Sequence, residues 1–180
     1  MSNTRSRHRN YQSGGTTMTV PIGLKKAAVL CILRSEAGFL LLRRNKEPNL
    51  GKYTPVGGHL EPFETPRAAA IREVKEEAGV SIEEIHLRGI MTETSPTEYN
   101  WIIYIYTADI TAIPPVDCVE GTLEWVARER LDTIPMPTTD GFIYDYVSRS
   151  QFFVFDAVYD ENVRLITLVD ELSGRVVFRG

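Results

Sequence analysis

Apolar and β-branched residues recur in short runs along the chain, and turn-forming residues separate one run from the next. These runs lie at positions 27–33, 39–42, 85–91, 101–110, 123–127, 151–158 and 163–169. Each run is long enough for one strand, and Ser35-Glu36-Ala37-Gly38 predicts a hairpin between the first two. Positions 101–110 are apolar on both faces, which predicts a central, covered strand. Asp160-Glu161-Asn162 predicts the turn of a second hairpin.

Two segments have helical patterns. The first follows Thr65, a favoured N-cap, with Pro66 at the first helical position and Gly79 where a C-terminal glycine ends a helix. The second covers positions 140–148, and its apolar face is formed by Phe142, Ile143, Tyr146 and Val147. Proline and glycine between positions 48 and 58 indicate a region rich in loops. Strands mixed with two helices indicate an α/β or α+β layered domain.

Length and composition narrow the class of protein. The chain has 180 residues, of which 43% are hydrophobic, and this predicts one folded domain over residues 23–180. The preceding residues 1–22 carry no acidic side chain and predict a flexible tail. The longest uninterrupted apolar stretch, at positions 27–33, is far shorter than the roughly 20 residues of a membrane span. We therefore expect no membrane partner.

Charge and cysteine content also narrow the expected partners and location of the protein. The formal net charge is −4 with a pI near 5.5, which gives no reason to expect a nucleic-acid polymer as the main partner. Cys31 lies in an apolar run and Cys118 in an expected loop, and their spacing fits neither a disulfide framework nor a zinc site. A reducing cytoplasm fits this usage best. Monomer and homodimer both remain open.

Three carboxylates share one side of the first predicted helix. At about 100° per residue, Glu73, Glu76 and Glu77 fall within an arc of roughly 100°, whereas Ile71, Val74 and Ala78 cluster on the other side. Like charges at this spacing destabilise a helix, so we expect a positively charged partner to neutralise the three carboxylates. Mg²⁺ binds oxygen ligands, typically one or two carboxylates together with substrate phosphates. A solvated acidic face with flanking salt bridges is the alternative.

The acidic helix is part of a longer pattern. Its defined residues are Gly58, Glu64, Arg72, Glu73, Glu76, Glu77 and Gly79, with aliphatic Val74 and Val80. The pattern is Gly, five residues, Glu, seven residues, Arg-Glu-aliphatic, one residue, Glu-Glu, one residue, Gly-aliphatic. It resembles the Nudix box at every defined position. The segment that leads into the box, positions 51–57, also resembles the family.

The resemblance implies an α/β/α sandwich with a mixed β-sheet, and hydrolysis of a pyrophosphate linkage in a nucleoside diphosphate derivative. It implies that Mg²⁺, with Mn²⁺ as an alternative, is held by Glu73, Glu76 and Glu77 and by the carbonyl of Gly57. Arg72 is expected to hold a neighbouring carboxylate, and Glu64 to brace the loop against the helix. Metal ions at such a site shield phosphate charge and lower the pKa of a bound water.

The residue that takes the proton from the attacking water is left open between two regions of the chain. Members of the superfamily use either a glutamate of the box, here Glu73, or an acid from a later loop. Glu120 resembles the later acid in position, and Glu124 is its nearby competitor. Candidates for contacts with the substrate are Gly58, Tyr53 and Trp125.

The resemblance to mutator-type members favours a nucleoside triphosphate as substrate, with 8-oxo-dGTP as one example, cut to monophosphate and pyrophosphate. Pro96 lies sixteen residues beyond Val80, a spacing that resembles that of ADP-ribose pyrophosphatases. This resemblance implies an ADP-ribose or nucleotide-sugar pyrophosphatase instead. A third hypothesis, from another class, is a Nudix-fold module that senses a nucleotide without hydrolysing it. Because the box is complete, the enzyme is the favoured interpretation.

Overall fold

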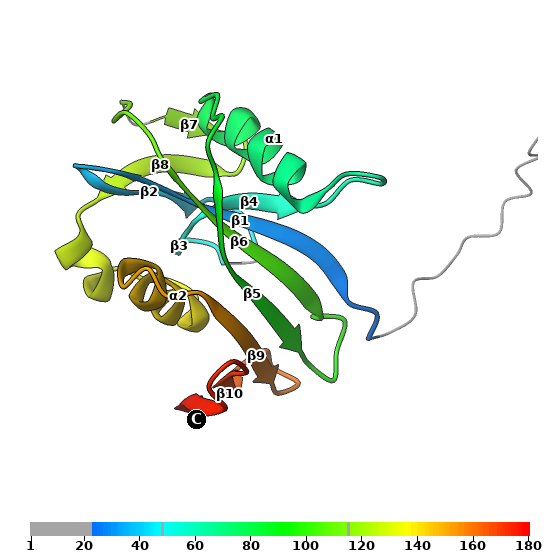
Figure 1. Cartoon of the computed structure of the whole chain (residues 1–180). Coiled ribbons are helices and arrows are strands. Elements are labelled where there is room, and N and C mark those ends of the chain that lie inside the picture. Colours follow the sequence, from blue (N-terminus) through cyan, green and yellow to red (C-terminus); the bar gives the residue numbers. More distant parts are fainter. Residues whose placement is uncertain (1–22, 48, 115) are drawn as a thin grey trace, which may run out of the picture.

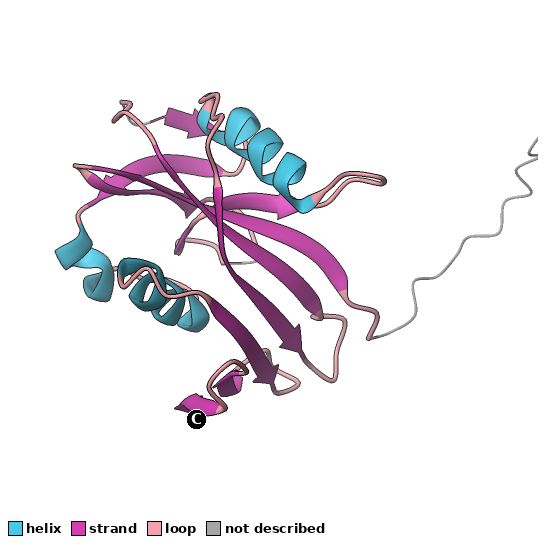
Figure 2. Cartoon of the chain, in the orientation of Figure 1, coloured by secondary structure: helices cyan, strands magenta, loops and turns pink. Residues whose placement is uncertain are grey.

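The computed structural model describes residues 23–47, 49–114 and 116–180, and the proposed tail at 1–22 lies outside the described residues. Figures 1 and 2 show a large twisted sheet with a helix on each face. The elements are β1 (Lys26–Ser35), β2 (Gly38–Arg44), β3 (Tyr53–Thr54), β4 (Val56–His59), α1 (Pro66–Ala78), β5 (His86–Thr94), β6 (Trp101–Asp109), β7 (Val116–Cys118), β8 (Gly121–Val126), the 3₁₀ helix η1 (Arg128–Thr133), α2 (Thr138–Ser148), β9 (Phe153–Tyr159), β10 (Leu165–Asp170) and β11 (Arg175–Arg179).

The sheet is mixed, as expected. Its strand order is β11-β10-β9-β5-β6-β1-β2-β8-β7, with β3 paired to β2 and β4 paired to β1. β1 is parallel to β6 and β5 is parallel to β9, whereas the other pairs are antiparallel. The segment predicted to be a central strand is β6, which lies between β5 and β1 in the middle of the sheet.

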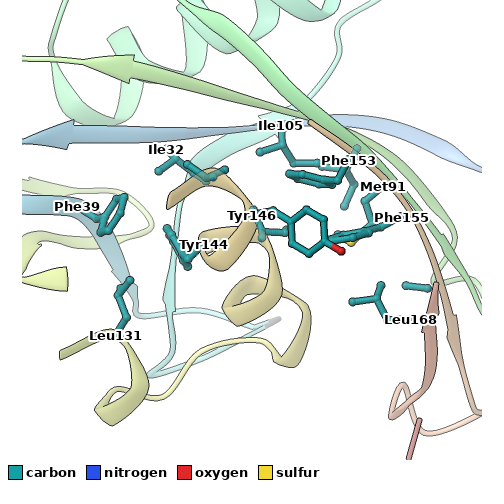
Figure 3. Packing of buried hydrophobic residues seen from close by; sticks show 14 of the residues in the cluster. Ile32, Phe39, Met91, Ile105, Leu131, Tyr144, Tyr146, Phe153, Phe155 and Leu168 are labelled. Atoms are coloured by element: carbon teal, nitrogen blue, oxygen red, sulfur yellow. The ribbon is translucent and has the colours of Figure 1, made fainter. Parts of the chain in front are cut away.

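Each face of the sheet packs against one helix. In β1 the side chains alternate, so that Ile32 faces α2 while Val29 and Leu33 face α1. On the α2 side, aromatic rings fill the core around Tyr146, which meets Phe155 edge to face (Figure 3). The architecture is therefore the α/β/α sandwich that the sequence predicted.

The ends of α1 are set by the residues that the sequence indicated. The Thr65 side chain accepts a hydrogen bond from the Ala68 amide, and Pro66 occupies the first turn. Gly79 ends the helix in the left-handed conformation, with φ 69°, and donates its N–H to the Lys75 carbonyl. These caps fix where the acidic residues of α1 lie along the chain.

Several elements differ from the prediction. The expected loop region before the box contains the short strands β3 and β4, and Cys118 ends strand β7 instead of lying in a loop. The second helix begins at Thr138, two residues earlier than predicted. The predicted hairpin forms as β9 and β10, followed by a further strand, β11. Among the described residues, no helix has the length and apolar character needed to cross a membrane.

Asp140 and Glu93 are among the carboxyl groups buried on the α2 side of the sheet. Asp140, in the first turn of α2, is 4% exposed, and its Oδ2 atom lacks a hydrogen-bond partner among the described residues. Glu93 of β5 is 2% exposed and accepts a hydrogen bond from the Tyr159 hydroxyl at 2.6 Å. Burial, together with the nearby Glu93 charge, raises the pKa of Asp140 to about 8, while Lys52 acts in the opposite direction.

Asp140→Asn is expected to raise the free energy of unfolding most at alkaline pH. The folded protein keeps a proton on Asp140 up to about pH 8, whereas the unfolded chain releases it near the ordinary pKa of 3.8. The stability of the parent therefore falls as pH rises through this window, by at most ~1.4 kcal/mol per pH unit, and Asn removes that loss. Denaturant unfolding at both ends of the window measures the difference. A gain that is larger at the acidic end contradicts the assignment.

Candidate active site

The residues of the box come together where β4, the loop after it and α1 meet. β4 pairs with β1, and α1 packs against both strands. The loop from β4 to α1 projects from the body of the molecule (Figure 1). β7 lies beside α1, so the turn from β7 to β8, which carries Glu120, is on the same side of the sheet.

Arg72 is the centre of the hydrogen bonds in the box. Its Nε and Nη2 atoms donate to the two carboxylate oxygens of Glu64 at 3.0 and 2.9 Å. Its Nη1 atom donates to Glu73 at 2.8 Å and to Glu76 at 3.2 Å, and Nη2 also donates to the His59 carbonyl at 3.0 Å. One guanidinium thus ties the loop to the helix and neutralises carboxylates of both. Bidentate pairs of this kind fix geometry as well as charge.

Two glycines of β4, Gly57 just before the box and Gly58 as its first residue, bring the backbone of the strand close to its neighbours. A Cβ atom at Gly58 would lie 2.3 Å from Glu73 Oε1, so a side chain there would displace the carboxylate. At Gly57 the obstacle is backbone, because a Cβ would lie 2.1 Å from the Val29 carbonyl oxygen. The Gly57 N–H donates to Glu77 Oε2 at 3.0 Å. The spacing of the box therefore serves a close contact between one strand and one helix.

Glu77 is buried, although the helical projection places it on an acidic face. It is 8% exposed, and its neighbours in the α1-side core are Val74 and Ala78. Burial is the main cause that raises its pKa to about 7, and the charges of Glu120 and Glu73 act in the same direction. The Gly57 amide and Arg44 oppose the rise. The alternative of a solvated acidic face is therefore wrong for Glu77.

Glu120 and Glu124 lie in different surroundings. The Glu120 carboxylate accepts a hydrogen bond from Arg44 at 2.7 Å, and its carbonyl accepts one from the Asn45 amide at 2.9 Å. Glu120 is close enough to Glu77 to influence its pKa. Glu124, in contrast, accepts a hydrogen bond from the Tyr53 hydroxyl at 3.1 Å. Of the two acids left open by the sequence, the structure thus brings Glu120 to the box.

The donor atoms near α1 suit a hard divalent cation. Glu73 and Glu76 each give one oxygen to Arg72, which leaves the other oxygen of each carboxylate for a different partner. The side chain of Glu76 is 58% exposed and that of Glu73 is 13% exposed. Among residues 23–47, 49–114 and 116–180, no three acidic, histidine or cysteine side chains already converge as a metal site. Mg²⁺ prefers oxygen ligands, and carboxylates are common among them, so the remaining oxygens of Glu73 and Glu76 fit it.

The sequence also predicts contacts with the substrate by two aromatic residues, Tyr53 and Trp125. Tyr53 of β3 is half-buried and bonded to Glu124, and Trp125 of β8 donates its indole N–H to the Ile113 carbonyl at 2.7 Å. The structure therefore already engages the polar atom of each ring. Sequence reasoning missed Arg44, whose guanidinium holds Glu120. The pairing of Arg44 with Gly121 across β2 and β8 reveals this contact, and no local motif signals it.

Comparisons with known proteins agree with this geometry. A family model of the NUDIX domain matches residues 24–151. The chain is 29% identical over 126 residues to the uncharacterized Nudix hydrolase YvcI of Bacillus subtilis, covering 67% of this chain and 78% of that protein. It is 35% identical over 89 residues to human diphosphoinositol polyphosphate phosphohydrolase 3-alpha, covering 48% of this chain and 53% of the relative, so it spans about half of that relative's length.

Solved structures show the same fold. A mutator MutT protein from Bacillus halodurans matches with a TM-score of 0.71 and 22% identity, covering 84% of this chain and 97% of that chain. The match of the family model extends over most of the described sheet and both helices, and it includes the complete box. The chain therefore belongs to the NUDIX domain family, as a Nudix hydrolase that acts on pyrophosphate bonds.

Proposed function

We propose that this protein hydrolyses a nucleoside triphosphate to the monophosphate and pyrophosphate in a reaction that depends on Mg²⁺, with Mn²⁺ as an alternative. The observation that carries the proposal is that carboxylates from two distant segments lie close enough for the charges of Glu73 and Glu120 to act on Glu77. Glu73 and Glu77 come from α1, and Glu120 comes from the turn after β7. A polyanionic substrate can approach such a cluster only when cations neutralise it, and a phosphate chain bound with cations meets that requirement.

The divalent cation supplies charge neutralisation and a bound water of lowered pKa. Glu73, Glu76, Glu77 and the Gly57 carbonyl would hold it. Arg72 keeps the helix carboxylates on the side that faces the loop, and Glu64 keeps Arg72 in place through its two hydrogen bonds. Gly58 leaves room for the Glu73 carboxylate where any side chain would collide with it.

In the reaction, a water oxygen attacks phosphorus, the phosphorus–oxygen bond of the anhydride breaks, and the leaving pyrophosphate carries away the bonding electron pair. Glu120 takes the proton from the water, with Glu73 as the other candidate base. The position of Glu120 beside the box, where its charge acts on Glu77, favours Glu120. Glu124 is disfavoured because its carboxylate lies at the Tyr53 hydroxyl of β3, whereas Glu120 lies close enough to Glu77 to influence its pKa.

The substrate is tested by a panel at one Mg²⁺ concentration. We expect kcat/KM to be higher for nucleoside triphosphates, including 8-oxo-dGTP, than for ADP-ribose, because three phosphates can bridge two or more of the cations that neutralise the carboxylate cluster. A diphosphoinositol polyphosphate belongs in the panel because the name of the human relative gives it as that protein's substrate. If ADP-ribose exceeds the triphosphates tenfold or more, the substrate is a nucleoside diphosphate derivative, and the Pro96 signal was the better guide.

A Nudix-fold module that binds a nucleotide without hydrolysing it is the alternative from another class. Product release in the same substrate panel distinguishes an enzyme from such a sensor. We propose a small nucleotide as the partner, not a nucleic-acid polymer, and a monomer or homodimer as the assembly. The two cysteines, Cys31 buried and Cys118 half-buried, are both free, which supports a cytoplasmic location.

A further inference from the structure

Phe63, at the tip of the loop between β4 and α1, combines full exposure with an unfavourable backbone conformation. Its relative exposure is 107%, the highest among the exposed large apolar side chains of the described residues. Its φ angle is 67°, in the left-handed region that a bulky residue rarely adopts. An outlier of this kind at a functional site is a reason to look for a role in binding.

The conformation follows from the turn that Phe63 occupies. The Glu64 amide donates to the Glu61 carbonyl at 3.1 Å, and Pro62 stands at the second position of this four-residue turn. Proline at the second position and positive φ at the third are features of a type II turn, in which glycine or asparagine is favoured at the third position. Phe63 thus stands where the backbone favours a residue without a large side chain.

The surrounding contacts hold the turn in place. The Glu64 carboxylate accepts hydrogen bonds from the Glu61 amide at 3.0 Å and from Arg72 at 3.0 and 2.9 Å. Arg72 in turn binds the carboxylates of Glu73 and Glu76. The turn that carries the exposed ring is therefore tied, through Glu64 and Arg72, to the same helix face that the proposed reaction uses. Because the turn is fixed, placing the ring against a ligand costs little conformational entropy.

We propose that Phe63 is a specificity-determining residue that contacts the aromatic base of a nucleotide bound at the box, a proposal that rests on the proposed function. The ring is isolated between exposed Glu61 and half-buried Glu64, with exposed Pro62 as its apolar neighbour. A protein interface requires a contiguous apolar core. A single rigid ring instead matches one flat heterocycle, which offers a stacking face of similar size.

The test compares substrates with and without a base. For each variant, kcat/KM is measured for a nucleoside triphosphate and for inorganic triphosphate, which has the same anhydride bonds and no base. Phe63→Gly is expected to lower the ratio of the two values about tenfold, through KM for the nucleotide, while Phe63→Trp restores it. Calorimetric binding of the nucleotide should weaken by the same factor in Phe63→Gly.

Val163→Gly is the matched control. Val163 lies in the turn between β9 and β10, also has positive φ, 59°, and is 42% exposed. Both glycine variants relieve the backbone, and each should raise the melting temperature by about 2–4 °C, but Val163→Gly should leave the substrate ratio unchanged. A ratio and a nucleotide affinity that stay unchanged in Phe63→Gly overturn the proposal. If the parent hydrolyses neither substrate, the proposed function fails, and the calorimetric comparison alone decides the role of Phe63.

Discussion

Glu77→Gln is expected to lower turnover by on the order of a hundredfold or more while making the metal-free protein more stable at neutral and alkaline pH. The activity falls because the substitution removes a preorganised charge from the site. The fold is kept because the amide has nearly the same shape, and its oxygen still accepts the Gly57 N–H. Activity and stability are therefore expected to change with opposite signs, because the charge that serves the reaction is buried at a cost to the fold.

The sign of the stability change follows from the raised pKa of Glu77. Its ordinary pKa is 4.5, and burial raises the value in the folded protein to about 7. The folded state therefore binds a proton that the unfolded chain has already released, and the stability of the parent falls as pH rises between these two values. Glutamine does not ionise, so its advantage over the parent should be small below this window and greatest above it.

Turnover, together with thermal melting in the presence of a chelator, checks both halves of this expectation. Glu83→Gln is the matched control because Glu83 is an exposed carboxylate just beyond α1, and we expect it to change neither quantity. Near-normal turnover in Glu77→Gln would show that the carboxylate has no part in the reaction. A loss of stability at alkaline pH would show instead that the Glu77 charge is favourable in the folded state.

The elements that depend on local residue chemistry could be predicted from the sequence. Thr65, Pro66 and Gly79 each act within a few residues of their own position, and α1 begins and ends as they indicated. The apolar residues on both faces of β6 likewise predicted that this strand lies in the centre of the sheet. The spacing of the box carried the identity of the family, since each of its constrained positions is visible in the chain itself.

Features that depend on contacts between distant residues could not be read in this way. β3 and β4 are only 2 and 4 residues long, and the glycines of β4, together with Pro55 between the two strands, resemble loop composition. Pairing with β2 and β1 makes these segments strands. The ion pair between Arg44 and Glu120 joins residues 76 positions apart. The burial of Glu77 depends on how α1 is rotated about its axis relative to β4. A helical projection of the sequence carries no information about that rotation.

Mg²⁺ is expected to raise the melting temperature relative to a sample with chelator, and chelation should abolish turnover. A cation present at a free concentration of 100 times its dissociation constant adds about 2.7 kcal/mol to the free energy of unfolding. For a chain of this size that corresponds to a shift of about 5–10 °C. Differential scanning calorimetry with and without Mg²⁺ measures the shift, and product release in the same buffers measures the activity.

The hydrogen bonds of Arg72 identify Glu73 and Glu76 as the carboxylates at which the effect of Mg²⁺ on stability can be tested. Glu73 and Glu76 are paired with Arg72 through one oxygen each, so a cation at the remaining oxygens shares both carboxylates with the guanidinium. The double variant Glu73→Gln with Glu76→Gln removes both charges and should lose the thermal shift, whereas Glu83→Gln should retain it. Equal melting curves for the parent with and without saturating Mg²⁺, together with activity that resists chelation, would mean that Arg72 alone neutralises the cluster. The carboxylates of α1 would then be structural partners of Arg72, and a cation would have no place in the reaction.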